Sequence, residues 1–516
     1  MESVTEANVA PPTPLEKDIS VFNEKDLGSE SVLVSPKRDL FQSSGDAQTH
    51  RRFDRKLALK TDLHVLFPML FLNFFSLMGR TNIGTALIQK LPTDLKLKPM
   101  DIVIAIVLAF VPLIVLEIPS NVLMRILEKK VGLGYIRYLS IMTALLGIVT
   151  VGQAFDQTKS DLFATRFVLG IFDAGLLPGS VFVCSLYYPT VHLQWRMAMI
   201  MIANISSNTT ANILAYAIAH LSNTSSNKWH GWRWIFLVEG CLTFGISVVC
   251  CYSSIARPET AKFLTHEEKT IVARDVESRE TTIGVATEFK IFFSNILNYI
   301  WAAALVFTAS TTYSVALFAP SFVEAFHPKY TVPQVQGQVV PIFVVSAAGC
   351  AITSFLADRY QHRISFALGG YLFTTIGFAI LRQSKLPAPS ISMLGLYFVS
   401  MGTYVSMPMV WSLTLANLPS PFQKAIGVGF VIGIGNVGAF TSAWFFRSAE
   451  APRYHSGMTN SLIFSVLAFA LVTFAAIYIV VANKRSDKLA ASAPIGGVDE
   501  DGQNVKSSGH VRRFYL

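Results

Sequence analysis

Twelve apolar segments, each long enough to cross a lipid bilayer as a helix, recur along this chain and constrain its fold more than any other feature. Inside a bilayer every backbone polar group needs a partner within the protein, and a helix meets this need within one segment. The sequence therefore predicts an all-α membrane protein with twelve transmembrane helices. The predicted spans are residues 63–84, 101–124, 135–154, 161–184, 197–220, 232–254, 297–323, 338–357, 364–383, 391–416, 424–446 and 459–482.

The composition excludes the main alternatives to a membrane protein. Hydrophobic residues make up 52% of the 516 residues and charged residues only 15%, whereas an ordinary soluble domain carries about 25% charged residues. Secreted scaffolds, nucleic-acid-binding modules and disordered proteins are thereby excluded. Basic loops against an anionic membrane leaflet explain the net charge of +9 better than a nucleic-acid partner does. The five cysteines lie in apolar runs without metal-ligand spacing, so we expect neither a metal nor a cofactor.

The longest break between spans follows the sixth span and divides the chain into two bundles of six helices. In this break Thr265 and Glu268 have the spacing of a capping box at the start of an amphipathic helix. Basic residues cluster at the ends of the spans that share a side with the termini and this break, so we expect that side to be cytoplasmic. The predicted regions are a disordered cytoplasmic tail (1–60), an N-terminal bundle (61–254), a cytoplasmic linker (255–294), a C-terminal bundle (295–483) and a cytoplasmic tail (484–516).

Ionisable residues inside spans are costly in a membrane and are therefore the first candidates for a functional site. Arg166 and Asp173 are seven residues apart in the fourth span, which places them on nearly one helix face. Arg80 lies near the outer end of the first span, so the two arginines are predicted to form a clamp for a carboxylate. Asp173 is the candidate for carrying a proton, and a purely structural ion pair is the alternative. For Glu117 and Glu239 we favour a structural role.

A polar stripe marks the fifth span, where Asn204, Asn208 and Asn212 recur every four residues. Such a stripe avoids lipid, so these amides either contact substrate in a central cavity or bond to a neighbouring helix. Asn223 opens an Asn-X-Thr/Ser sequence in a predicted outer loop and is a candidate glycosylation site.

Several longer strings occur in a fixed order: GRTNIGTALIQKLPTDLKL, LEIPSN, RFVLGIFDAGLLPG, GWRWIFLVEG, PETAKFLT, GNVGAF and APRYHSG. With these strings the chain resembles the allantoate-permease group of the anion:cation symporters, within the major facilitator superfamily, from Lys56 to Tyr478. The resemblance implies two helical bundles around a cavity, and uptake of small carboxylates together with protons. It also implies that Arg80 and Arg166 contact the substrate carboxylate and that Asp173 takes the proton. Residues expected to line the C-terminal half of the cavity are Tyr313, Asn417 and Asn436.

The chain departs from the family pattern at three places. The usual Asp before the arginine of the first span is Gly79, the fifth span carries asparagines in place of Ala and Gly, and Lys-Arg before the eleventh span is Gln423 and Lys424. We expect a monomeric, proton-coupled secondary transporter of a small organic anion, working by alternating access, with no enzymatic activity. We favour the plasma membrane over an internal membrane. The alternatives are an exporter of a larger or weakly charged metabolite and a membrane receptor that does not transport.

Overall fold

All regular structure in the described part of the chain is helical. The computed structural model describes residues 55–224, 230–252, 258–275, 285–383, 389–418, 420–447, 450–451 and 453–492. Most of the two predicted tails, residues 1–60 and 484–516, lies outside these ranges. Their described ends, residues 55–60 and 484–492, are helical, so the disorder predicted for residues 1–60 does not extend to residues 55–60.

The helices fall into three consecutive groups. The N-terminal half contains α2 (Arg55–Thr61), η1 (Asp62–Leu66), α3 (Phe67–Leu87), α4 (Leu91–Asp94), α5 (Pro99–Val131), α6 (Tyr135–Gln153), α7 (Lys159–Asp173), α8 (Leu176–Tyr187), α9 (Thr190–Thr224) and α10 (Gly231–Cys251). The linker contains η2 (Pro258–Thr260), α11 (His266–Asp275) and α12 (Val285–Ser294). The C-terminal half contains α13 (Ile296–Phe326), α14 (Val332–Tyr360), α15 (Arg363–Gln383), α16 (Pro389–Ala416), α17 (Pro421–Gly435), α18 (Val437–Phe445) and α19 (His455–Ser492).

Eleven helical segments in the described residues are long and apolar enough to cross a membrane. The helix missing from this count is α9, the predicted fifth span, which has 35 residues but carries the polar asparagine stripe. It packs lengthwise against α3 and α14, as the other long helices pack against their neighbours. The helix continues to Thr224, so Asn223 lies in its last turn and not in a loop, and its side chain is outside the described residues.

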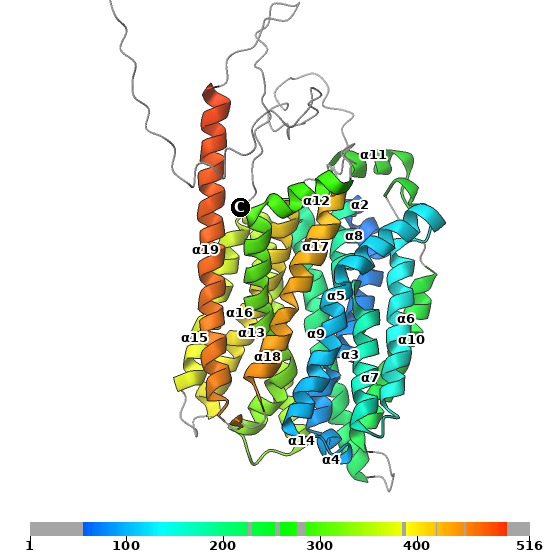
Figure 1. The fold of residues 1–516 in the computed structure, drawn as a ribbon, viewed down its shortest axis with the longest axis vertical. Coiled ribbons are helices and arrows are strands. Elements are labelled where there is room, and N and C mark those ends of the chain that lie inside the picture. Colours follow the sequence, from blue (N-terminus) through cyan, green and yellow to red (C-terminus); the bar gives the residue numbers. More distant parts are fainter. Residues whose placement is uncertain are drawn as a thin grey trace, which may run out of the picture. The chain divides into compact units, whose positions relative to one another are not determined.

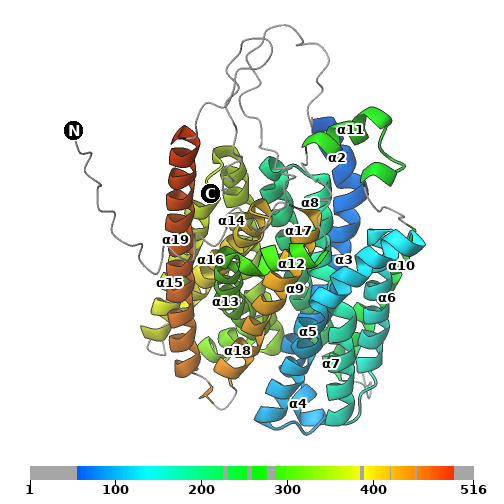
Figure 2. The ribbon, with the colours of Figure 1, turned by 45° about the horizontal axis from the view of Figure 1, so that its top comes forward.

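The two halves pack against each other through helices that are far apart in the sequence. In Figures 1 and 2 α5 lies beside α18, and α5 also contacts α17. A second seam joins α9 to α14 and α16, and a third joins α3 to α13. Figure 1 also shows α11 and α12 at one end of the helices and α4 at the other, and we call these the linker end and the α4 end.

Contacts between the halves are present at both ends. At the linker end Gln194 of α9 donates to Ser354 of α14 (3.3 Å) and accepts from Ser412 of α16. Towards the α4 end, a Cβ placed on Gly84 of α3 would lie 2.5 Å from the carbonyl oxygen of Leu317 of α13, so the two backbones touch. The halves therefore touch at both ends, and we call this arrangement the closed form. A cavity of about 200 Å³ lies between them near the α4 end, where its lining includes Leu87, Ile102, Phe318 and Tyr454.

Two of the long helical segments are interrupted near their middle. The first break lies between α7 and α8, where Gly175 takes a left-handed conformation (φ +85°). Ser120 of α5 donates to the carbonyl of Ala174 (2.8 Å), which the break leaves without its helical partner. The second break is slighter and lies between α17 and α18 at Asn436, whose backbone stays in the right-handed helical region (φ −64°, ψ −14°). Broken helices inside a membrane are tolerated where protein or a cavity surrounds them, so both breaks indicate places of functional interest.

The linker contacts each half through a different helix. The predicted capping box is confirmed, because Thr265 and Glu268 exchange hydrogen bonds at the start of α11. Glu268 also pairs with Lys60 of α2 (2.7 Å) in the N-terminal half. In α12 the buried Glu288 accepts from Ser420 (2.9 Å) and Gln423 (2.7 Å) at the start of α17. The unusual Gln423 therefore holds the linker to the C-terminal half.

We predict that Gly175→Ala lowers the melting temperature of the purified protein more than Gly132→Ala does. Both positions have positive φ, where a Cβ costs about 1–2 kcal/mol. Only at position 175 would the Cβ also collide with Ser120 and disturb its bond to Ala174, since nothing lies within 4 Å of a Cβ at Gly132. Equal melting temperatures for the two variants would contradict this account of the break.

Candidate functional site

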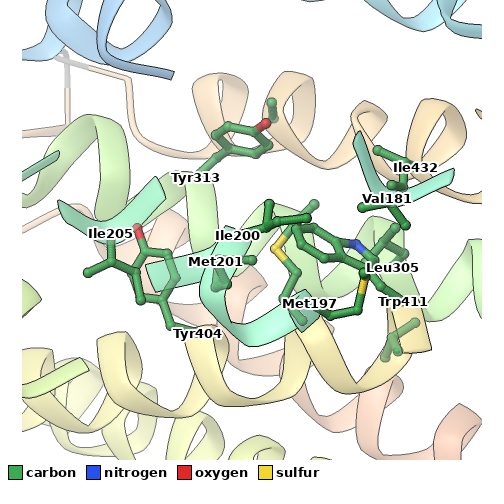
Figure 3. Packing of buried hydrophobic residues seen from close by; sticks show 14 of the residues in the cluster. Val181, Met197, Ile200, Met201, Ile205, Leu305, Tyr313, Tyr404, Trp411 and Ile432 are labelled. Atoms are coloured by element: carbon green, nitrogen blue, oxygen red, sulfur yellow. The ribbon is translucent and has the colours of Figure 1, made fainter. Parts of the chain in front are cut away.

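A small cavity lies between the two halves. Its volume is about 30 Å³, which is enough for roughly two water molecules. Its polar lining comprises Asn73, Arg80, Asn204, Asn208, Thr312 and Tyr313, and its apolar lining comprises Leu77, Leu177, Met201, Ala316, Tyr404, Met407 and Trp411. Figure 3 shows four of these lining residues, Met201, Tyr313, Tyr404 and Trp411, packed among buried hydrophobic residues. The cavity therefore has one positive charge, several amides and a largely apolar and aromatic wall.

Arg80 of α3 is the centre of the polar lining. Its Nε lies 2.8 Å from Oδ2 of Asp173, the last residue of α7 before the first helix break. Its Nη1 donates to the hydroxyl of Tyr313 of α13 (2.9 Å), and Ser76 donates to the other oxygen of Asp173. Arg80 is 5% exposed and Asp173 2%. A buried pair of this kind is held by mutual attraction and its extra hydrogen bonds, because either charge alone would be costly.

The hydrogen bonds continue across the interface between the halves. Tyr313 donates to Oδ1 of Asn436 (3.1 Å), and Nδ2 of Asn436 donates to Oε2 of Glu117 of α5 (3.1 Å). One connected network thus runs from the first helix break to the second. The sequence suggested a structural role for Glu117 and did not place it here. The signal available was its position beside Pro119 in a span, but helical spacing alone does not identify the neighbouring helix.

Arg166 lies outside this network. The predicted shared face with Asp173 does not lead to a shared contact, because seven residues correspond to about 10 Å along a helix and Arg80 fills the gap. Arg166 instead donates to Oδ1 of Asn82 (3.1 Å) and to the carbonyl of Arg80 (3.3 Å), and its guanidinium lies over the ring of Phe236. It does not line the cavity. An ion pair between Arg166 and Asp173 was the structural alternative for these residues, and the structure instead pairs Asp173 with Arg80.

A second buried cluster surrounds Arg166 within the N-terminal half. Asn82 also donates to Oε2 of Glu239 of α10 (2.9 Å), so this amide bridges Arg166 and Glu239. Asp156, in the turn before α7, accepts from Thr165 (3.0 Å), and burial raises the pKa of its carboxyl to about 6. All of these groups belong to one half. The arrangement agrees with the structural role expected for Glu239.

The other predicted site residues divide into those at the cavity and those away from it. Asn204 and Asn208 line it, whereas Asn212 does not and donates to the carbonyl of Asn208 (2.7 Å). Tyr313 lines the cavity, and Asn436 reaches it only through Tyr313. Asn417 does not line it and donates to the carbonyl of Leu413 (2.9 Å) at the end of α16. The asparagine stripe thus contributes two of its three amides to the cavity.

Position 79 is Asp in the family that the sequence resembles, and in this structure it faces α6 and not the cavity. A Cβ on Gly79 would lie 3.3 Å from Leu146 and Thr150 of α6, inside the N-terminal half. An Asp side chain at this position would therefore leave α3 on the side that faces α6. Among the described residues, no group of His, Cys, Asp and Glu side chains is arranged to hold a metal ion.

Curated relatives align with nearly the whole chain. A transporter of Schizosaccharomyces pombe without an assigned substrate is 25% identical over 95% of this chain and 96% of its own length. The high-affinity nicotinic acid transporter of Saccharomyces cerevisiae is 23% identical over 86% of this chain and 81% of its own length. The major facilitator-type transporter hxnP of Emericella nidulans is 24% identical over 88% of this chain and 90% of its own length.

Solved transporter structures share the fold at low sequence identity. The proton:xylose symporter XylE has a TM-score of 0.60 at 12% identity, covering 80% of this chain and 95% of that one. The human organic anion transporter MFSD10 has a TM-score of 0.54 at 12% identity, covering 80% of this chain and 99% of that one. The family model of the Major Facilitator Superfamily matches residues 69–443, which include the whole network from Ser76 to Asn436. The chain therefore belongs to the Major Facilitator Superfamily and is a multi-pass membrane transporter.

Proposed function

We propose that this secondary transporter carries a small organic carboxylate together with a proton, as in the allantoate-permease group. The observation that carries the proposal is Arg80, which lines the cavity and forms an ion pair with Asp173. An arginine offers a planar fork of donors that stays charged and matches a carboxylate. Here that fork already holds a carboxylate of the protein, in the place where a substrate carboxylate would compete.

The cavity wall favours a small, flat acid. Tyr313 lies beside Arg80 and offers a hydroxyl to the same carboxylate. Asn204 and Asn208 supply amides on the α9 side, and Tyr404 and Trp411 supply aromatic surface from α16. Pockets of this composition orient a ligand with a few polar groups and bind it with apolar and aromatic contacts. The relative named as a nicotinic acid transporter supports this class of substrate.

Proton coupling follows from the competition for Arg80. While Asp173 is ionised it holds Arg80, and a substrate carboxylate that displaced it would leave a buried, unpaired negative charge. Protonation of Asp173 removes that charge and releases Arg80 to the substrate. Each ligand therefore favours binding of the other, which is reciprocal coupling between two sites.

Alternating access follows from the closed form. A cavity of about 30 Å³ is too small for an organic acid, so the halves must separate at one end to admit it. We propose that the six-helix bundles before and after the linker are the moving units, with the linker end in the cytoplasm. Inward transport by a monomer in the plasma membrane is part of the same proposal.

The direct test is flux of radiolabelled organic acids in proteoliposomes with an imposed pH gradient. We expect a small aromatic or heteroaromatic monocarboxylate to accumulate in the compartment of higher pH. Arg80→Gln should raise the half-saturation constant for this acid by roughly 10- to 100-fold, which corresponds to about 1.5–3 kcal/mol for a charge-assisted bond. Accumulation of uncharged analogues with equal efficiency would contradict the proposed substrate class, and efflux without uptake would contradict the direction.

We expect Asn208→Ala to change the ranking of acids in this panel, with Asn212→Ala as its matched control. The two residues are one turn apart on α9 and both are buried, but only Asn208 lines the cavity. A site that hydrogen-bonds a substrate group discriminates against ligands that lack it. The ranking is measured as relative kcat/KM at equal amounts of inserted protein. A change for Asn212→Ala alone would show that the stripe acts through helix packing.

A further inference from the structure

One short segment of α5 contacts both helix breaks. Within the string LEIPSN, Ser120 donates to the carbonyl of Ala174 at the first break, and Glu117 accepts from Asn436 at the second. The first break belongs to the N-terminal half and the second to the C-terminal half. This segment is therefore the place where the end of α7, which carries Asp173, is joined to the interface between the halves.

Glycines of α17 let this helix approach α5 closely at this segment. A Cβ on Gly433 of α17 would lie 3.0 Å from Oε2 of Glu117, and a Cβ on Gly429 would lie 3.2 Å from Nδ2 of Asn121. Asn121 is 2% exposed, and neither atom of its side-chain amide has a hydrogen-bond partner within the described part of the chain. Closure of α5 against α17 thus buries polar groups that water would satisfy if the helices separated.

The charges in the network do not balance. Asp173 and Glu117 are two carboxyl groups near one guanidinium, and Arg80 is committed to Asp173 at 2.8 Å. Glu117 is 1% exposed and has the single amide of Asn436 as its described hydrogen-bond donor. An ionised carboxylate with so little compensation is strongly disfavoured inside a membrane protein. The closed form therefore requires a proton on one of the two carboxyl groups.

We propose that Glu117 is a second proton-binding residue of the transport cycle, and that its neutral form allows α5 to pack against the break between α17 and α18. Loss of this proton makes the closed interface unfavourable and drives the two helices apart towards water. The proposal rests on the proton coupling proposed above and adds a second carboxyl group to it. In this scheme Asp173 controls access to Arg80, and Glu117 controls closure.

The groups that face Glu117 allow its titration to be isolated. Among the described residues, the charged side chains that interact with Glu117 are Arg80 of α3 and Asp173 of α7, and Tyr313 of α13 is linked to it through Asn436. The α17 and α18 side contributes Asn436 and Gly433, which do not ionise. Replacing Asp173 by Asn removes the second carboxyl group of this network, so Arg80 can then balance the charge of an ionised Glu117.

The chain supplies a matched control for Glu117. Glu239 is also a fully buried glutamate in a membrane span that accepts one bond from an asparagine amide, at 2.9 Å against 3.1 Å. The difference is that Asn82 and Glu239 belong to the same half, whereas Glu117 and Asn436 belong to opposite halves. Movement of the halves should therefore change the surroundings of Glu117 and leave those of Glu239 unchanged.

The test uses full-length protein in proteoliposomes, without substrate, with a reporter thiol introduced by Ala316→Cys in the cavity wall. The alkylation rate of that thiol by a methanethiosulfonate reagent measures how often the cavity opens. Peptide mass spectrometry reads this position separately from the native cysteines. Rates are compared at each pH from about 5 to about 9 among the otherwise unaltered reporter protein, Glu117→Gln and Glu239→Gln. Ratios at equal pH cancel the pH dependence of the thiol itself.

We expect the rate for the reporter protein with Glu117 and Asp173 intact, divided by that for Glu117→Gln, to be near one at low pH. It should then rise with pH by up to about tenfold per pH unit, as for one linked proton. The corresponding ratio for Glu239→Gln should stay near one. A flat ratio for Glu117→Gln, or an equal rise for Glu239→Gln, would overturn the proposal. The same ratios are also measured with Asp173→Asn in all three proteins, which provides a second background if Glu117→Gln alone does not fold. The rise should be smaller there, because Arg80 can then balance the charge of Glu117. Because no substrate is used, failure here is distinct from failure of the carboxylate flux.

Discussion

The ion pair between Arg80 and Asp173 is the interaction on which the rest of this structure depends. Both side chains lie deep between membrane-spanning helices, where a single charge without a partner would be strongly unfavourable. The pair fixes the end of α7 against α3, and the helix breaks immediately after Asp173. It also determines which residue is available to a ligand, because Arg80 is the charged residue that lines the cavity.

From this pair the polar network reaches the other half of the molecule and returns. Tyr313 and Asn436 belong to the C-terminal half, while Arg80 and Glu117 belong to the N-terminal half. Separation of the halves on this side must break at least one of these bonds. A buried hydrogen bond that loses its partner costs about 1–3 kcal/mol unless water or ligand replaces it. Under the proposed function, substrate and protons offer this replacement and so would link binding to movement.

Sequence periodicity predicted the elements well and the contacts between them poorly. It located the spans, the capping box at Thr265 and Glu268, and the polar stripe of which Asn204 and Asn208 reach the cavity. These features depend on spacing within one helix. The partner of Asp173 depends on the depth at which an antiparallel neighbour places its side chains, and here α3 brings Arg80 between Asp173 and Arg166. The place of Glu117 depends on packing across the two halves, which no single helix encodes.

The most direct measurement of the central claim is the number of protons taken up when the protein binds its acid. Isothermal calorimetry in buffers of different ionisation enthalpy gives this number from the slope of the binding enthalpy. The account predicts an uptake of about one proton per acid bound, because a substrate that occupies Arg80 requires Asp173 to be neutral. It predicts no uptake for Asp173→Asn with binding retained. Binding of the acid to the unaltered protein without any proton uptake would contradict the account.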